Sequence, residues 1–126
     1  MSERHTMTIE AHAHALKLAR EWVGEIFETW SIDPYLGKLI VSELAGNVLK
    51  HTDTDQMTVR LYWADRGPVI EVEDSSPDLP VVHEMSPDKL DGRGLAMIQL
   101  LAADLGWNVT SGGGKCVYAV LPGVAA

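Results

Sequence analysis

Two neighbouring segments with a period of two residues set the strongest constraint on how this chain of 126 residues folds. From Met57 to Trp63, apolar side chains alternate with other residue types, and a second such run extends from Val69 to Asp74. The turn sequence Asp65–Pro68 separates them. Alternation of this length is typical of strands with one buried face, and a short turn makes such strands antiparallel. We therefore expect a hairpin that lies with one face against a core.

Two helices are predicted before this hairpin. Apolar residues recur at helical spacing from about His12 to Trp30. A second helix is expected to have Asp33 as its N-cap and Pro34 at its first position, and to end at Lys50 or His51. The apolar residues of the first helix, expected in the core, are Ala15, Leu18, Ala19, Trp22, Val23, Ile26, Phe27 and Trp30.

The remaining segments complete one α+β domain over residues 1–126. A short edge strand is expected over Thr6–Glu10, and the proline-rich segment Ser75–Asp91 is expected to be a loop. A helix should follow Gly94, and a last hairpin should pair Trp107–Thr110 with Cys116–Leu121. The face of that third helix is expected to carry Leu95, Ile98, Leu101, Ala102 and Leu105. This order predicts a two-layer sandwich, with helices on one face of a mixed, mostly antiparallel sheet.

Composition excludes several classes of protein. Hydrophobic residues make up 46% and charged residues 22%, which indicates a globular chain instead of a disordered one. The net charge of −8 argues against a nucleic-acid surface, which needs clustered Lys and Arg. No apolar run is long enough to cross a membrane, and the only cysteine, Cys116, cannot form an internal disulfide. We therefore expect a cytoplasmic protein that binds neither nucleic acid nor membrane.

Glu43 and Asn47 interrupt the apolar face of the second predicted helix. At about 100° per residue they lie one turn apart within the stripe that runs from Leu36 to Leu44. Lys50 and His51 extend the same line. Either the two side chains reach solvent from the edge of the stripe, or they form the polar floor of a groove. In a groove, Asn47 could ligate a hard cation such as Mg²⁺ and Glu43 could act as a general base.

Asp74 is a second polar residue in an apolar phase. It ends its strand on the same face as Ile70 and Val72. An inward carboxylate there could accept a hydrogen bond from an exocyclic amine such as that of adenine. Alternatively, the side chain caps the turn at Ser75–Pro77. Both interpretations remain open from the sequence.

Glycines precede the third predicted helix and the last strand. Gly92 and Gly94 flank Arg93 just before the helix, where free backbone N–H groups could approach a phosphate. A lone Gly-x-Gly is weak evidence for such a site. The run Gly112–Gly114 is interpreted as a flexible hairpin turn.

In order and spacing, the segments Glu43–Asn47, Val72–Asp74 and Gly92–Leu95 resemble the motifs of the Bergerat-type ATPase superfamily, which includes histidine kinases and gyrase-type topoisomerases. Within it, the chain is most similar to the bacterial serine-kinase anti-sigma factors and their single-domain actinobacterial relatives. The resemblance extends from about Thr8 to Pro122. The segments that carry the closer likeness are Val41–Leu44, Asn47–His51, Asp74–Pro77 and Gly113–Lys115.

This resemblance implies a role for each matching residue. Glu43 corresponds to the general base, Asn47 to the ligand of a Mg²⁺ ion that bridges the phosphates, and Asp74 to the carboxylate that reads adenine. The remaining residues expected around ATP or ADP are Lys50, His51, Ser76, Pro77, Gly92, Arg93, Gly94, Leu95 and Cys116.

Two departures from the family pattern concern the same end of the site. Ser76 and Asp78 occupy positions where the first glycine box has glycines. Near the last strand, Lys115 and Cys116 stand where a threonine is common, and the thiol of Cys116 is a weak hydrogen-bonding group.

Two functions follow as hypotheses. The first is a protein serine kinase of the anti-sigma type, which transfers the γ-phosphate of ATP to a serine of an antagonist protein. The alternative is a catalytically silent, nucleotide-responsive module that sequesters its partner. The resemblance implies a sigma factor, an antagonist or both as partners, and a homodimer.

Overall fold

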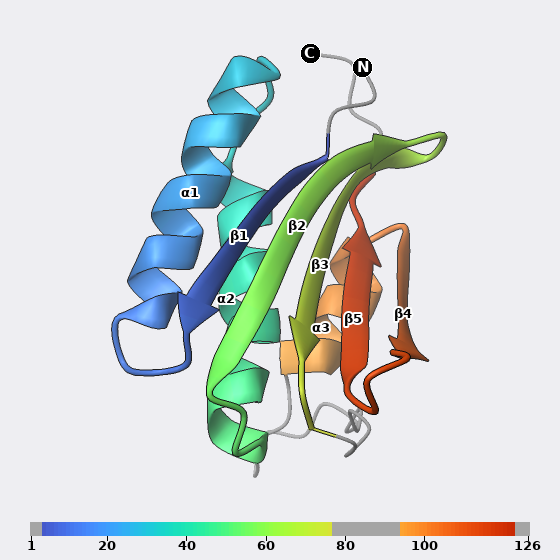
Figure 1. Ribbon diagram of the computed structural model, residues 1–126. Coiled ribbons are helices and arrows are strands. Elements are labelled where there is room, and N and C mark those ends of the chain that lie inside the picture. The colour runs from blue at the N-terminus through green and yellow to red at the C-terminus, as the bar shows by residue number, and fades with distance from the viewer. Residues whose placement is uncertain (1–3, 77–93, 123–126) are drawn as a thin grey trace, which may run out of the picture.

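A five-stranded sheet backed by helices forms the domain (Figure 1). The computed structural model describes residues 4–76 and 94–122. The elements are β1 (His5–Glu10), α1 (Ala15–Thr29), α2 (Tyr35–His51), β2 (Gln56–Ala64), β3 (Gly67–Asp74), α3 (Gly94–Leu101), β4 (Asp104–Val109) and β5 (Lys115–Val120). The strand order is β1-β2-β3-β5-β4, and all four ladders are antiparallel. The predicted α+β two-layer sandwich is confirmed.

The period of two in the central strands sorts their side chains between two faces. Val59 and Leu61 of β2 and Val72 of β3 are almost fully buried against the helices. Residues on the opposite face are mainly polar, and we call this surface the open face. It carries Thr58, Arg60, Tyr62, Glu71, Glu73, Cys116 and Tyr118.

Charged groups on the open face compensate one another. Arg60 lies 2.8 Å from Glu73 and 3.5 Å from Glu71, and the hydrogen bond to Glu73 raises the pKa of the guanidinium. The hydroxyl of Tyr62 donates to Glu71. Burial, followed by this hydrogen bond, raises the pKa of Tyr62 to about 12. The open face is therefore an interlocked polar surface in which each charge already has a partner.

Element boundaries differ from the sequence expectation where local hydrogen bonds compete with regular structure. α1 begins at Ala15 and not at His12, because His12 Nδ1 accepts the backbone N–H of His14 in a preceding turn. Leu18, expected in the core, is 47% exposed. α2 begins at Tyr35 with Pro34 as its N-cap, one residue later than expected, and Asp33 Oδ1 accepts the N–H of Tyr35 at 2.9 Å.

The last hairpin is longer than expected. β4 begins at Asp104, so Leu105 belongs to this strand and pairs with Ala119 in β5 instead of extending the face of α3. The prediction for Leu105 was wrong because an apolar residue after a helix fits either period. No helix among the described residues is long and apolar enough to span a bilayer.

α1 and α2 approach closely at Gly37. A Cβ atom at this position would lie 2.6 Å from Cε2 of Phe27, whereas a Cβ at Gly46 of the same helix would meet nothing within 4 Å. Phe27 is 1% exposed and cannot move away without opening the core. The absence of a side chain at Gly37 therefore sets the distance between the helices.

These two glycines provide a matched test of the packing. Gly37→Ala should lower the free energy of unfolding by at least ~1 kcal/mol, because overpacking outweighs the gain in helix propensity. Gly46→Ala should raise it by ~0.5–1 kcal/mol. Urea unfolding followed by circular dichroism measures both. Equal effects of the two substitutions would contradict this account of the helix contact.

Candidate functional site

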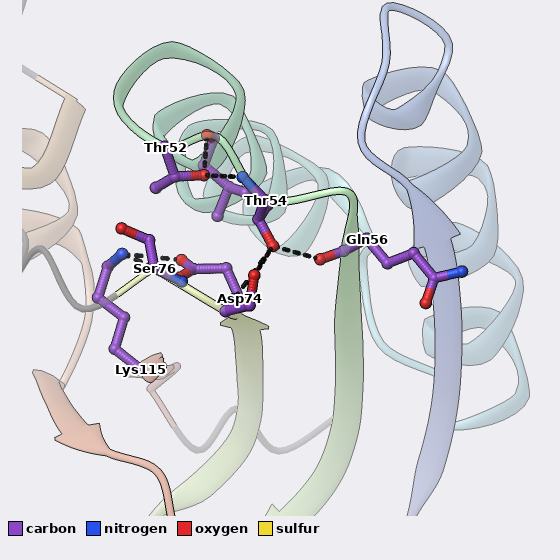
Figure 2. Close-up of polar contacts among 8 residues, drawn as sticks. Thr52, Thr54, Gln56, Asp74, Ser76 and Lys115 are labelled. Atoms are coloured by element: carbon purple, nitrogen blue, oxygen red, sulfur yellow. Dashed lines mark hydrogen bonds and ion pairs between the residues drawn. The ribbon is translucent and has the colours of Figure 1, made fainter. Parts of the chain in front are cut away.

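A buried ion pair lies where β3 ends and β5 begins. Asp74 and Lys115 are direct partners in the antiparallel ladder, and their side chains are 0% and 6% exposed. Lys115 Nζ lies 3.0 Å from Oδ1 and 2.9 Å from Oδ2 of the carboxylate (Figure 2). Oδ1 also accepts the backbone N–H of Ser76 at 2.8 Å. Asp74 is thus both an inward carboxylate and the cap of its turn, so the two interpretations of the sequence hold together.

The two carboxylate oxygens of Asp74 are not equally satisfied. Oδ1 has two well-directed donors. Oδ2 is buried and close to the ammonium of Lys115, but that contact lacks hydrogen-bond geometry, and no other described residue donates to it. A buried acceptor without a donor is costly. Oδ2 is therefore the atom of this site that is best suited to receive an N–H group from a ligand.

Backbone contacts fix the position of Asp74. Thr54 Oγ1 accepts the N–H of Ser75 at 3.1 Å, contacts the hydroxyl of Ser75 at 2.7 Å and donates to the carbonyl of Gln56 (Figure 2). On the other side, a Cβ atom at Gly114 would overlap the carbonyl oxygen of Asp74. Gly114 is buried, so it serves a close backbone approach and is not merely part of a flexible turn.

The polar residues of α2 have an intermediate environment. Glu43 and Asn47 are partly buried, and each directly precedes a buried residue, Leu44 and Val48 respectively. Partial burial agrees both with side chains that reach solvent from the edge of the apolar stripe and with the polar floor of a groove. Both side chains keep some contact with solvent on a helix that packs against β3 and α3.

The last turn of α2 and the start of α3 also bear on the predicted site. Lys50 and His51 are exposed at the end of α2, where basic groups favour the negative pole of the helix. Gly94 begins α3, and Leu95 is 5% exposed within the hydrophobic core. Pro77, Gly92 and Arg93 lie outside the described residues.

Cys116 does not lie beside Asp74. Successive residues of a strand point to opposite faces, so Lys115 takes the inner position and Cys116 lies on the open face, opposite Glu73 and Asn108. Burial, followed by the negative charge of Glu71, raises the pKa of its thiol to about 12. The predicted contact between Cys116 and the nucleotide would therefore have to form on the face of the sheet opposite the side chain of Asp74.

A polar hollow of about 730 Å³ lies at the end of the sheet. Its lining includes Asp74 together with the acidic residues Glu10, Asp55 and Glu73, but neither Glu43 nor Asn47. Acidic walls disfavour a phosphate-bearing ligand, and the side chain of Asp74 is fully shielded from solvent on this side as well. The predicted site residues Glu43 and Asn47 lie outside this hollow, on α2.

Lys115 and Gly114 were not recognised as functional in the sequence analysis. A usable signal was present, because Lys115 has the same phase as Val117 and Ala119. A lysine on the inner face is the same kind of exception as Asp74. If β3 and β5 are adjacent, the opposite charges of Asp74 and Lys115 at the facing ends of these strands indicate an ion pair.

The sequence from residue 9 to 121 matches the family model of the histidine kinase-like ATPase domain. The chain therefore belongs to this family of ATPase domains. No curated protein matches it.

A solved structure with the same fold contains the RsbU and RsbW domains of Rv1364c from Mycobacterium tuberculosis. The superposition has a TM-score of 0.70 at 17% sequence identity and covers 96% of this chain. This chain corresponds to 32% of the length of that protein, and at such low identity the likeness shows the fold alone.

The residues present fit the adenine base of a nucleotide at Asp74. A magnesium ion would take most of its ligands from the phosphates. Asp74 Oδ2 is a buried acceptor for an exocyclic amine. The described residues contain no group of three or more His, Cys, Asp or Glu side chains that could hold a metal ion. Asn47 could therefore contribute a single amide oxygen to an ion whose other ligands are phosphate oxygens and water.

Lys115→Met tests the energetic weight of the ion pair. Removing the ammonium leaves a buried carboxylate without compensation, so the free energy of unfolding should fall by ~3–5 kcal/mol. Lys17→Met is the matched control: Lys17 lies 3.9 Å from Glu21 on the surface of α1, and its loss should cost less than ~0.5 kcal/mol. Urea denaturation at pH 7 measures both. Similar losses in the two variants would contradict a buried pair.

Proposed function

We propose that this domain binds ATP and acts as an anti-sigma-type protein serine kinase. Membership of the histidine kinase-like ATPase family supports nucleotide binding. The observation that carries the proposal is the buried carboxylate of Asp74 on the strand beside α2, which holds Glu43 and Asn47: among the described residues its Oδ2 is contacted only by the ammonium of Lys115, without hydrogen-bond geometry. A carboxylate held in this way is suited to accept a hydrogen bond from an exocyclic amine of a nucleobase.

The phosphates would extend from the base toward α2. Asn47 would ligate a Mg²⁺ ion, which neutralises phosphate charge when bound. Phosphoryl transfer depends mainly on positioning and charge neutralisation, so one base and one metal ligand from the protein suffice. Glu43 would accept the proton of the serine hydroxyl of a partner, and its partial exposure leaves it accessible to another protein.

A silent binding module is the second candidate. Ser76 stands where the family has a glycine. The side chain of Asp74 has no exposed area, so adenine can contact its carboxylate only if neighbouring side chains move aside. A domain of this kind could retain slow nucleotide binding without transfer. The partial exposure of Glu43 favours the kinase.

The proposed partners follow from the family resemblance. A sigma factor, its antagonist or both would bind the domain in the cytoplasm, and the domain would act as a homodimer. The net charge of −8 supports a protein partner instead of nucleic acid.

Calorimetric titration with ATP tests the nucleotide site. The wild type should bind ATP, and Asp74→Asn should weaken binding ~10- to 100-fold, because a hydrogen bond to a charged acceptor is lost. Glu73→Gln, on the open face, is the matched control and should bind ATP as the wild type does. Melting temperatures confirm that each variant is folded. Failure of the folded wild type to bind ATP at millimolar concentration would overturn the proposal.

Transfer of labelled γ-phosphate to candidate antagonist proteins separates the two candidate functions. The kinase predicts phosphoserine on one antagonist with the wild type, and a loss of at least ~100-fold with Glu43→Ala while ATP affinity is unchanged. Glu25→Ala on α1 provides a control with a similar change of charge. Equal phosphate transfer by wild type and Glu43→Ala would exclude Glu43 as the base, and binding without any transfer would favour the silent module.

A further inference from the structure

Lys115 places a hydrogen-bond donor directly beside the acceptor that would read the base. Its Nζ atom lies 2.9 Å from Asp74 Oδ2, the oxygen without a well-directed donor. Both groups lie on the inner face of the sheet, at facing ends of β3 and β5. The site therefore presents an acceptor and a donor side by side.

The ammonium has donor capacity left. A lysine carries three N–H donors, and among the described residues the structure gives Nζ only the two oxygens of Asp74 as partners. Since Oδ1 takes the only well-directed hydrogen bond, at least one N–H of Lys115 remains for a third acceptor. The side chain is 6% exposed, so a ligand group that reached it would form this bond away from water.

Adenine has the complementary pair on its Watson–Crick edge. The exocyclic N6 amine is a donor, and the adjacent ring nitrogen N1 is an acceptor. We propose that Lys115 is a specificity-determining residue for the nucleobase: its ammonium donates to N1 while Asp74 Oδ2 accepts from N6. This assignment rests on the ATP binding proposed above.

The pair also explains how a buried carboxylate is tolerated at this position. A fully shielded carboxylate needs a compensating charge, and Lys115 supplies it from the adjacent strand. Asp74 is therefore held ready for the base in one orientation, since Ser76 and Lys115 both fix Oδ1. A bound adenine would add a donor at Oδ2 once neighbouring groups moved aside, and Lys115 would keep its hydrogen bond to Oδ1.

The test compares ATP with 1-deaza-ATP, which lacks N1, by calorimetry. The wild type should bind 1-deaza-ATP ~10-fold or more weakly than ATP, because a charge-assisted hydrogen bond is lost. In Lys115→Met the two ligands should differ by less than about twofold. Lys115→Arg, which keeps a charged donor, should restore discrimination. Purine riboside triphosphate, which lacks the N6 amine, should bind weakly to wild type and Lys115→Met alike, since Asp74 is unchanged.

Each outcome decides one of the two proposals. No binding of ATP to the folded wild type overturns the ATP site itself. If ATP binds, but 1-deaza-ATP binds equally well to the wild type, the role of Lys115 is wrong while the ATP site stands. The role of Lys115 is also wrong if Lys115→Met keeps the wild-type ratio of the affinities for ATP and 1-deaza-ATP. An increase in ATP affinity with an unchanged ratio would lead to the same conclusion. Should Lys115→Met not fold, Lys115→Gln keeps an uncharged donor, and the ratio should fall to a few-fold.

Discussion

The structure depends on the placement of a charged carboxylate inside the domain at the end of β3. An ion without solvent requires a partner of opposite charge and directed donors, and the fold supplies both at Asp74. The ammonium comes from β5, and the directed N–H comes from the turn that follows β3. The register of β3 and β5 sets Asp74 opposite Lys115, and the absence of a side chain at Gly114 allows the backbone to approach the carbonyl oxygen of Asp74.

The two faces of the sheet differ in how their polar groups are compensated. The open face pairs its charges with one another, and there the pKa of Tyr62 and of Cys116 rises because burial and nearby glutamates disfavour their anions. The helix face excludes water and leaves one acceptor, Asp74 Oδ2, without a directed donor. A ligand that offers an N–H group would gain most on the second face, where the proposed nucleotide site and the core would share one side of the sheet.

The elements were largely predictable because their apolar periods are regular. The hairpin of β2 and β3, both long helices and the two-layer arrangement follow from repeats of two and 3.6 residues. Predictions failed where a shift of one residue along a strand decides which face a side chain occupies. Leu105 fits either a helix or a strand, and Lys115, which β5 places on the inner face, was not among the predicted site residues. Glu43 and Asn47 were recognised because a charged or amide group within an apolar stripe is rare, and they are partly buried.

The sequence by itself determined which polar residues occupy apolar positions of a helix or strand. Local periodicity can be read without knowing which residues are neighbours in space. Only the tertiary structure decided which exceptions meet. Asp74 and Lys115 are 41 residues apart and form one ion pair because β5 is inserted beside β3, a choice of strand order that local sequence does not encode. The same long-range pairing separates Cys116 from the site, because neighbours along a strand face opposite sides of the sheet.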